Sequence, residues 1–75
     1  MYVSVKFKDK WSGEFRGREY SYVCNIPGIA VGDVVIAPTA RGDSEVQISA
    51  INVPESSISP VIRTVLKEIT QRKEA

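Results

Sequence analysis

Hydrophobic and polar residues alternate at the start of the chain. Val3, Val5 and Phe7 fall on one side of an extended segment, and the serine and lysine residues between them fall on the other. This period of two is typical of a half-buried β-strand and predicts a strand over about residues 2–8. Similar alternation, or a short apolar run closed by proline, predicts three more strands. They cover about residues 19–25, 33–37 and 45–52.

Turn-forming residues separate these predicted strands. Residues 9–18 combine two glycines with a high density of charge, which predicts a long loop or a ragged, bulged hairpin. Pro27 and Gly28 predict a turn, because proline fixes φ and glycine supplies a positive φ at the next position. A further turn is expected at residues 41–43.

The hydrophobic period changes after Ser59 and Pro60. From there the apolar residues recur at intervals of one and three, which predicts an amphipathic helix over about residues 60–73. Ser59 is expected to cap the free amides, and Pro60 suits the first helical position because it lacks a backbone donor. The predicted apolar face consists of Val61, Ile62, Val65, Leu66 and Ile69.

These elements predict one domain over residues 1–75 that is mainly β (α+β). Four to five short strands are too few for a sandwich, so we expect a small, strongly bent, antiparallel, barrel-like sheet with one C-terminal amphipathic helix. An open four-stranded meander with the helix across one face is the alternative. Exchange of strands between two chains is also compatible with so small a core, because oligomerisation adds buried surface.

Composition narrows the chemistry that the chain can perform. Its 75 residues include no histidine and a single cysteine, Cys24. Imidazole is therefore absent as a general base or metal ligand, and an intrachain disulfide cannot form. No acidic loop or ligand spacing indicates a cation site. We accordingly expect no enzymatic activity, no cofactor and no bound metal.

The same features bear on the compartment. The N-terminal alternation does not resemble a signal peptide, and no run of about 20 apolar residues is present, so no membrane partner is expected. A chain without an intrachain disulfide suits a reducing environment, and the sequence predicts a cytoplasmic protein. Cys24 is then expected to serve as a small hydrophobic residue of a strand.

Aromatic and basic residues are concentrated in the first third of the chain. All six aromatic residues lie within residues 1–22, and residues 1–19 carry five basic and three acidic side chains, whereas the whole chain has a net charge of +1. Exposed aromatic side chains in the charged loop would form an apolar anchor. We therefore predict a non-enzymatic binding or adaptor domain, with a protein partner or self-association. Its predicted contact residues are Trp11, Phe15, Arg16 and Arg18.

Single-stranded nucleic acid is the alternative partner, because phosphates need cations and unstacked bases need flat partners. It would use the same aromatic and basic residues together with three lysines, Lys6, Lys8 and Lys10. The predicted helix offers a second candidate surface, a modest basic strip. This strip comprises Arg63, Lys67 and Arg72.

Residues 20–51 carry a more specific pattern. It consists of an aromatic strand, a Val-Gly-Asp-Val-Val bend at residues 31–35, Pro38 after the next strand, and a following strand of valine and isoleucine. The pattern resembles the small, SH3-like β-barrel at the N-terminus of primosomal replication helicases, a domain that binds the 3′ end of a DNA strand. The resemblance implies the barrel more directly than the DNA binding. At residues 39–42 the sequence departs from the more aromatic and basic stretch of that family, and no helicase motor follows. We expect a small bacterial or phage protein.

Overall fold

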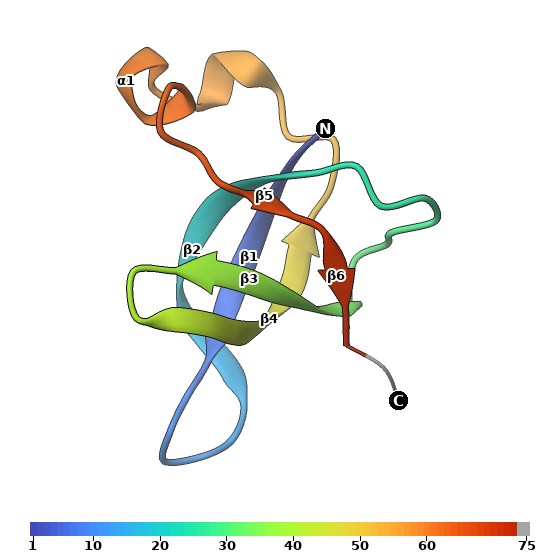
Figure 1. Cartoon of the computed structure of the whole chain (residues 1–75), viewed down its shortest axis with the longest axis vertical. Helices are drawn as coiled ribbons and strands as arrows, with labels where there is room; N and C mark the ends of the chain where they lie inside the picture. Colours follow the sequence, from blue (N-terminus) through green and yellow to red (C-terminus); the bar gives the residue numbers. More distant parts are fainter. Residues whose placement is uncertain (74–75) are drawn as a thin grey trace.

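Two antiparallel hairpins form the centre of the structure, a computed structural model that describes residues 1–73 (Figure 1). In chain order the elements are β1 (Tyr2–Lys8), β2 (Phe15–Cys24), β3 (Val34–Thr39), β4 (Gly42–Ala50), η1 (Glu55–Ser57), α1 (Pro60–Arg63), β5 (Glu68–Ile69) and β6 (Gln71–Arg72). β1 pairs with β2, β3 pairs with β4, and the pairing of β1 with β4 joins the two hairpins. The strand order across the sheet is β5-β2-β1-β4-β3-β6.

The core lies on one face of this sheet, because alternate residues of each strand point to the same side. Val3 and Val5 of β1 are buried, as are Val46 and Ile48 of β4. Cys24 is a buried free thiol, which confirms its predicted role as a small hydrophobic residue of a strand. The buried cluster comprises Val3, Val5, Tyr22, Cys24, Ile29, Val35, Ala37, Val46, Ile48 and Ile69.

The turn at Pro27 and Gly28 forms as predicted. Gly28 has a φ of 75°, and the backbone N–H of Ile29 donates to the carbonyl of Ile26 at 3.3 Å. Arg72 Nη2 also donates to the carbonyl of Pro27 at 2.6 Å. The turn is therefore held to the C-terminal segment of the chain.

The limits of β2, β3 and β4 differ from the predicted ones. β2 begins at Phe15 rather than near residue 19, because the hairpin continues through a bulge. Its register with β1 shifts between Lys6 and Lys8, and Gly17 in the bulged segment has a φ of 93°. Thr39 pairs with Gly42 across a two-residue turn, so β3 ends later and β4 begins earlier than predicted.

The predicted helix over residues 60–73 is wrong. Only α1, at Pro60–Arg63, is helical, and the side chain of Ser59 makes no capping hydrogen bond. The chain then becomes extended, so that β5 pairs with β2 in parallel and β6 pairs with β3 in antiparallel. The sheet is therefore mixed and six-stranded, where four to five antiparallel strands are predicted.

Burial of one side chain explains this difference. Ile69 is 0% exposed, whereas Val65, which belongs to the same predicted helix face, is 70% exposed. The spacing of apolar residues fits a helix, but an extended segment brings Ile69 into the core and gives the edges of β2 and β3 a hydrogen-bonded partner. A helix bonds to itself and would leave both edges open.

The C-terminal segment joins the two edges of the sheet. Val23 N donates to the carbonyl of Lys67 at 3.0 Å, and Lys73 N donates to the carbonyl of Val34 at 3.2 Å. Only Thr70 separates β5 from β6, as the red segment in Figure 1 shows. β5 and β6 do not pair with each other, so the hydrogen-bonded sheet stays unclosed.

Glu45 on β4 connects the end of this segment to β1. Its carboxylate lies 2.7 Å from Lys73 Nζ and 3.4 Å from Lys8 Nζ. The hydrogen bond from Lys73, supported by the one from Lys8, lowers the pKa of Glu45. Two strands and the C-terminal segment thus share one carboxylate.

Ile69→Ala should lower the free energy of unfolding by about 2–5 kcal/mol, because it removes a fully buried side chain and leaves a cavity. Val65→Ala is the matched control and should change it by less than about 0.5 kcal/mol. Urea denaturation followed by circular dichroism measures both variants. Equal losses from the two substitutions would instead support the helix.

Glu45→Gln should lower the free energy of unfolding at neutral pH and make that free energy less sensitive to acid. The folded pKa of Glu45 is lowered, so its ion pairs stabilise the fold above the ordinary value of 4.5 and lose their effect as the pH falls through the folded pKa. The difference in urea midpoint between the wild type and E45Q should therefore shrink between about pH 7 and about pH 3.

Glu14→Gln is the control for this measurement, because the Glu14 side chain forms no ion pair within residues 1–73. It should follow the wild type across the same range. A difference between the wild type and E45Q that stays constant with pH would contradict the role of Glu45.

Candidate functional site

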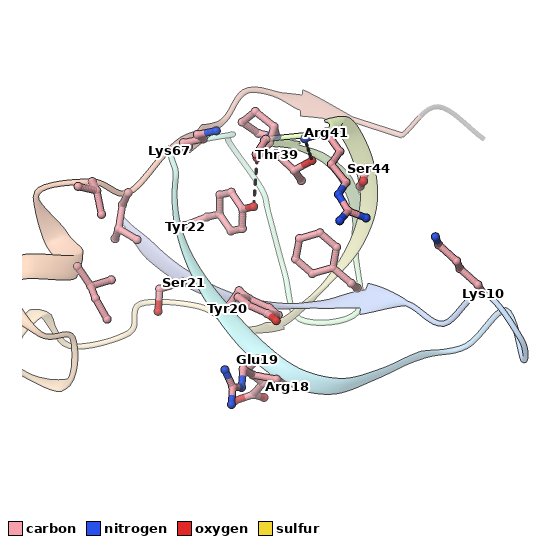
Figure 2. A pocket seen from close by; sticks show the side chains of 16 residues that line it. Lys10, Arg18, Glu19, Tyr20, Ser21, Tyr22, Thr39, Arg41, Ser44 and Lys67 are labelled. Atoms are coloured by element: carbon pink, nitrogen blue, oxygen red, sulfur yellow. Dashed lines mark hydrogen bonds between the residues drawn. The ribbon is translucent and has the colours of Figure 1, made fainter.

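An open groove lies where the C-terminal segment leaves part of the sheet uncovered. β5 pairs only with Val23 and Cys24 of β2, and β6 pairs only with Val35 and Ile36 of β3. Closer to the two hairpin turns, no strand of the described residues pairs with the outer edge of β2 or of β3. The groove at this place has a volume of about 1070 Å³ (Figure 2).

Cations and apolar side chains dominate the lining of the groove. The four cations are Lys10, Arg18, Arg41 and Lys67, and Glu19 is the one acid among the lining residues. The aromatic lining residues are Phe7, Tyr20 and Tyr22, and the aliphatic ones on the side of the C-terminal segment are Ile62, Val65 and Leu66. The other lining residues are small or polar: Ser21, Pro38, Thr39, Ala40 and Ser44.

Tyr22 forms the inner wall of the groove and spans it. Its ring belongs to the buried core, and its hydroxyl donates to the carbonyl of Pro38 at 3.1 Å, so that β2 and β3 are linked where no strand joins them (Figure 2). Burial raises the pKa of Tyr22, and the neighbouring Tyr20 hydroxyl adds to this effect. The hydroxyl is therefore held in its protonated, donating form.

Tyr20 is the aromatic ring that the groove offers to a ligand. It is 47% exposed, and Phe7 packs against it edge to face, with the ring centroids 5.2 Å apart and the planes at 79°. Phe7 itself is only partly exposed and packs on the core. The contact with Phe7 of β1 therefore fixes the orientation of the Tyr20 ring.

The β3–β4 turn supplies Arg41. Its backbone N–H donates to Thr39 Oγ1 at 3.2 Å, and Gly42 completes the turn with a φ of 107°. In Figure 2 Arg41 and Thr39 lie together at the side of the groove that faces Tyr22. A tight, internally bonded turn thus carries a cation across from β2.

The predicted anchor residues lie on the β1–β2 loop and on the first part of β2, and hydrogen bonds to Asp9 hold the loop. Asp9 accepts hydrogen bonds from the backbone N–H groups of Trp11 at 2.7 Å and Ser12 at 3.3 Å, and its carboxylate lies 3.4 Å from Arg16 Nε. The backbone bonds, aided by Arg16, lower the pKa of Asp9. Trp11 is 98% exposed and Phe15 is half-buried, and neither lines the groove.

The structure divides the basic residues predicted for binding. Lys10 and Arg18 line the groove. Lys8 pairs with Glu45 and Arg16 pairs with Asp9, while Lys6 lies opposite Glu19 in the β1–β2 register. Of the predicted basic strip, Lys67 lines the groove, whereas Arg63 pairs with Glu55 and Arg72 lies 4.0 Å from Asp33.

Sequence reasoning missed the residues that complete the groove. Tyr20 and Tyr22 fall within the strand predicted over about residues 19–25, and Arg41 falls within the turn predicted at residues 41–43, so the sequence singles out none of them for binding. The alternation that makes β2 a strand also places these two tyrosines on one side, which is the one local signal available. The partners contributed by the β3–β4 turn and the C-terminal segment depend on the topology.

Within residues 1–73 no three acidic, cysteine or histidine side chains gather as a metal site would require. No helix in this range is long and apolar enough to span a membrane.

Tyr22→Phe should lower the free energy of unfolding by about 0.5–1.5 kcal/mol, because the carbonyl of Pro38 loses its hydrogen bond. The folded pKa of Tyr22 is raised, so this contribution is full below the ordinary value of 10.0 and is lost as the pH rises further. Tyr20→Phe is the control, because the Tyr20 hydroxyl makes no hydrogen bond within residues 1–73. Thermal and urea unfolding at neutral and alkaline pH test both, and equal effects would contradict the bridging role of Tyr22.

Comparison with known proteins finds no counterpart: no family model, no curated protein and no solved structure matches the chain.

Proposed function

We propose that the chain is a non-enzymatic binding domain that takes a protein partner in the groove between β2 and β3. The observation that carries this proposal is the exposed apolar rim of the groove. Val65 is 70% exposed and Ile62 is 49% exposed, and both line the groove together with Tyr20. Apolar side chains that converge on one concave surface are typical of an interface that a partner covers.

The charge of the groove specifies the partner further. Four cations and one acid line it, although the whole chain has a net charge of only +1. Complementary charge raises the association rate and disfavours basic partners. The partner is therefore a polypeptide that combines apolar side chains with acidic ones.

Single-stranded nucleic acid is the second candidate, favoured by the same excess of cations. The resemblance of residues 20–51 to a DNA-end-binding domain gives this candidate its most specific form. Stacking surfaces support it less, because Phe7 and Tyr22 belong largely to the core and Tyr20 is the one half-exposed ring in the groove. Binding of unstacked bases generally uses several exposed rings along the strand.

The protein-partner proposal predicts that the full chain enriches binders from a displayed library of random 12-residue peptides. Arg41→Glu and Val65→Asp should each weaken the selected peptides at least about tenfold, which corresponds to about 1.4 kcal/mol. Trp11→Ala is the matched control outside the groove and should leave the affinity unchanged. Loss of binding with Trp11→Ala alone would move the site to the β1–β2 loop, and absence of enrichment would refute the proposal.

A titration with a mixed single-stranded DNA and RNA oligonucleotide separates the two candidates. Amide shifts of the labelled protein are recorded at about 50 mM and about 200 mM salt, because phosphate binding weakens steeply with salt. The proposal predicts no saturable shifts at either concentration. Shifts at Tyr20, Arg41 and Lys67 that vanish at the higher concentration would favour nucleic acid instead.

A further inference from the structure

The backbone of β2 presents hydrogen-bonding groups to the groove. The backbone N–H of Val23 points toward β5 and donates to the carbonyl of Lys67. The backbone N–H of Cys24 points toward β1 and donates to the carbonyl of Met1. Backbone groups of an antiparallel strand alternate in direction along the chain. Ser21 and Glu19 therefore turn their N–H and carbonyl groups toward the β5 side, as Val23 does.

These backbone groups have no strand partner within residues 1–73. β5 pairs with β2 only at Val23 and Cys24, and the strand order places no other element beside this edge. No hydrogen bond to the backbone of Ser21 or Glu19 is formed on that side in the described part of the chain. Both residues line the groove. An unpaired strand edge is thus part of the wall of the groove.

β5 demonstrates that this same edge accepts an extended chain. The segment pairs in parallel with the last two residues of β2 and then leaves the edge, so that the remaining part of the edge is continuous with an established pairing. An added strand gains affinity from main-chain hydrogen bonds and specificity from alternate side chains.

We propose that the partner inserts an extended, acidic segment into the groove as an additional strand, which pairs with the β2 edge at Glu19 and Ser21 in line with β5. This inference rests on the proposed function and specifies its mode of recognition. Every second side chain of the added strand faces Tyr20 and the apolar rim, and the others lie on the outer face of β2. Figure 2 places Arg18 on that outer face.

Charge determines which polypeptide fits. An acidic segment meets Arg18 on one face and Arg41 across the groove, with Lys67 and Lys10 on the lining as well. A second copy of this chain, paired edge to edge through β2, would bring two such sets of four cations together. An acidic segment of another protein is therefore the occupant that the lining favours.

The sequences of the peptides selected from the random 12-residue library provide the first test. The proposal predicts net acidic peptides with apolar residues at every second position. Proline-spaced motifs, or apolar residues at intervals of three and four, would overturn strand addition while leaving a protein-binding groove in place. Absence of any enrichment would overturn both this inference and the proposed function.

Hydrogen exchange of the complex with the tightest selected peptide provides the direct test. The amides of Glu19 and Ser21 should exchange at least about tenfold more slowly in the complex, because they become hydrogen-bonded. Tyr20 and Tyr22 point their amides toward β1 and should change little. Peptide binding without protection of Glu19 and Ser21 would overturn strand addition, and protection in the free protein that rises with its concentration would assign the edge to a second copy.

Ser21→Pro and Ser21→Ala form a matched pair of variants. Proline removes the outward N–H, which makes no bond to β1, and should weaken peptide binding at least about tenfold, whereas alanine keeps the N–H and should bind normally. Circular dichroism establishes that each variant is folded.

If Ser21→Pro does not fold, N-methylation of alternate backbone amides of the peptide replaces it. Methylation of one alternate set of peptide amides should abolish binding, and methylation of the other set should be tolerated. Equal tolerance of both sets would overturn the proposal.

Discussion

Burial of Ile69 between the edges of β2 and β3 is the interaction on which the rest of the structure depends. The two hairpins share the β1–β4 pairing. On the other side their outer strands, β2 and β3, are joined by the segment that carries this side chain and by the hydrogen bond from Tyr22 to Pro38. One fully buried isoleucine and a few backbone hydrogen bonds are therefore the main connection between β2 and β3 on this side. Because the core is small, such a side chain accounts for a large share of the net stability.

The groove follows from the shortness of that segment. β5 and β6 each contribute two residues, so they cover only one end of the gap between β2 and β3. Tyr22 bridges the gap with its hydroxyl but leaves the backbone edge of β2 free. The short C-terminal segment completes the core but leaves part of the β2 edge and the apolar rim of the groove exposed. A partner can bind to both features.

Local sequence patterns predict the hairpins well and the C-terminal segment poorly. The alternation around Val3 and Val5 gives the limits of β1, and the positive φ of Gly28 is what the turn chemistry requires. Ile69 is different, because its spacing from Val65 fits a helix and only the presence of two open edges makes the extended form better. The groove escapes prediction for a related reason, since Tyr20, Arg41 and Lys67 come from distant parts of the chain that only the topology brings together.

The exposure of Trp11 has a practical consequence. It is the sole tryptophan, and at 98% exposure its indole is as hydrated in the folded protein as in an unfolded chain. Its fluorescence emission should therefore shift little when the sheet unfolds. Tryptophan fluorescence, the usual optical probe of denaturation, would not detect the unfolding transition. The backbone N–H of Trp11 donates to Asp9 within the β1–β2 loop, so the emission and anisotropy of the indole report on whatever approaches that loop.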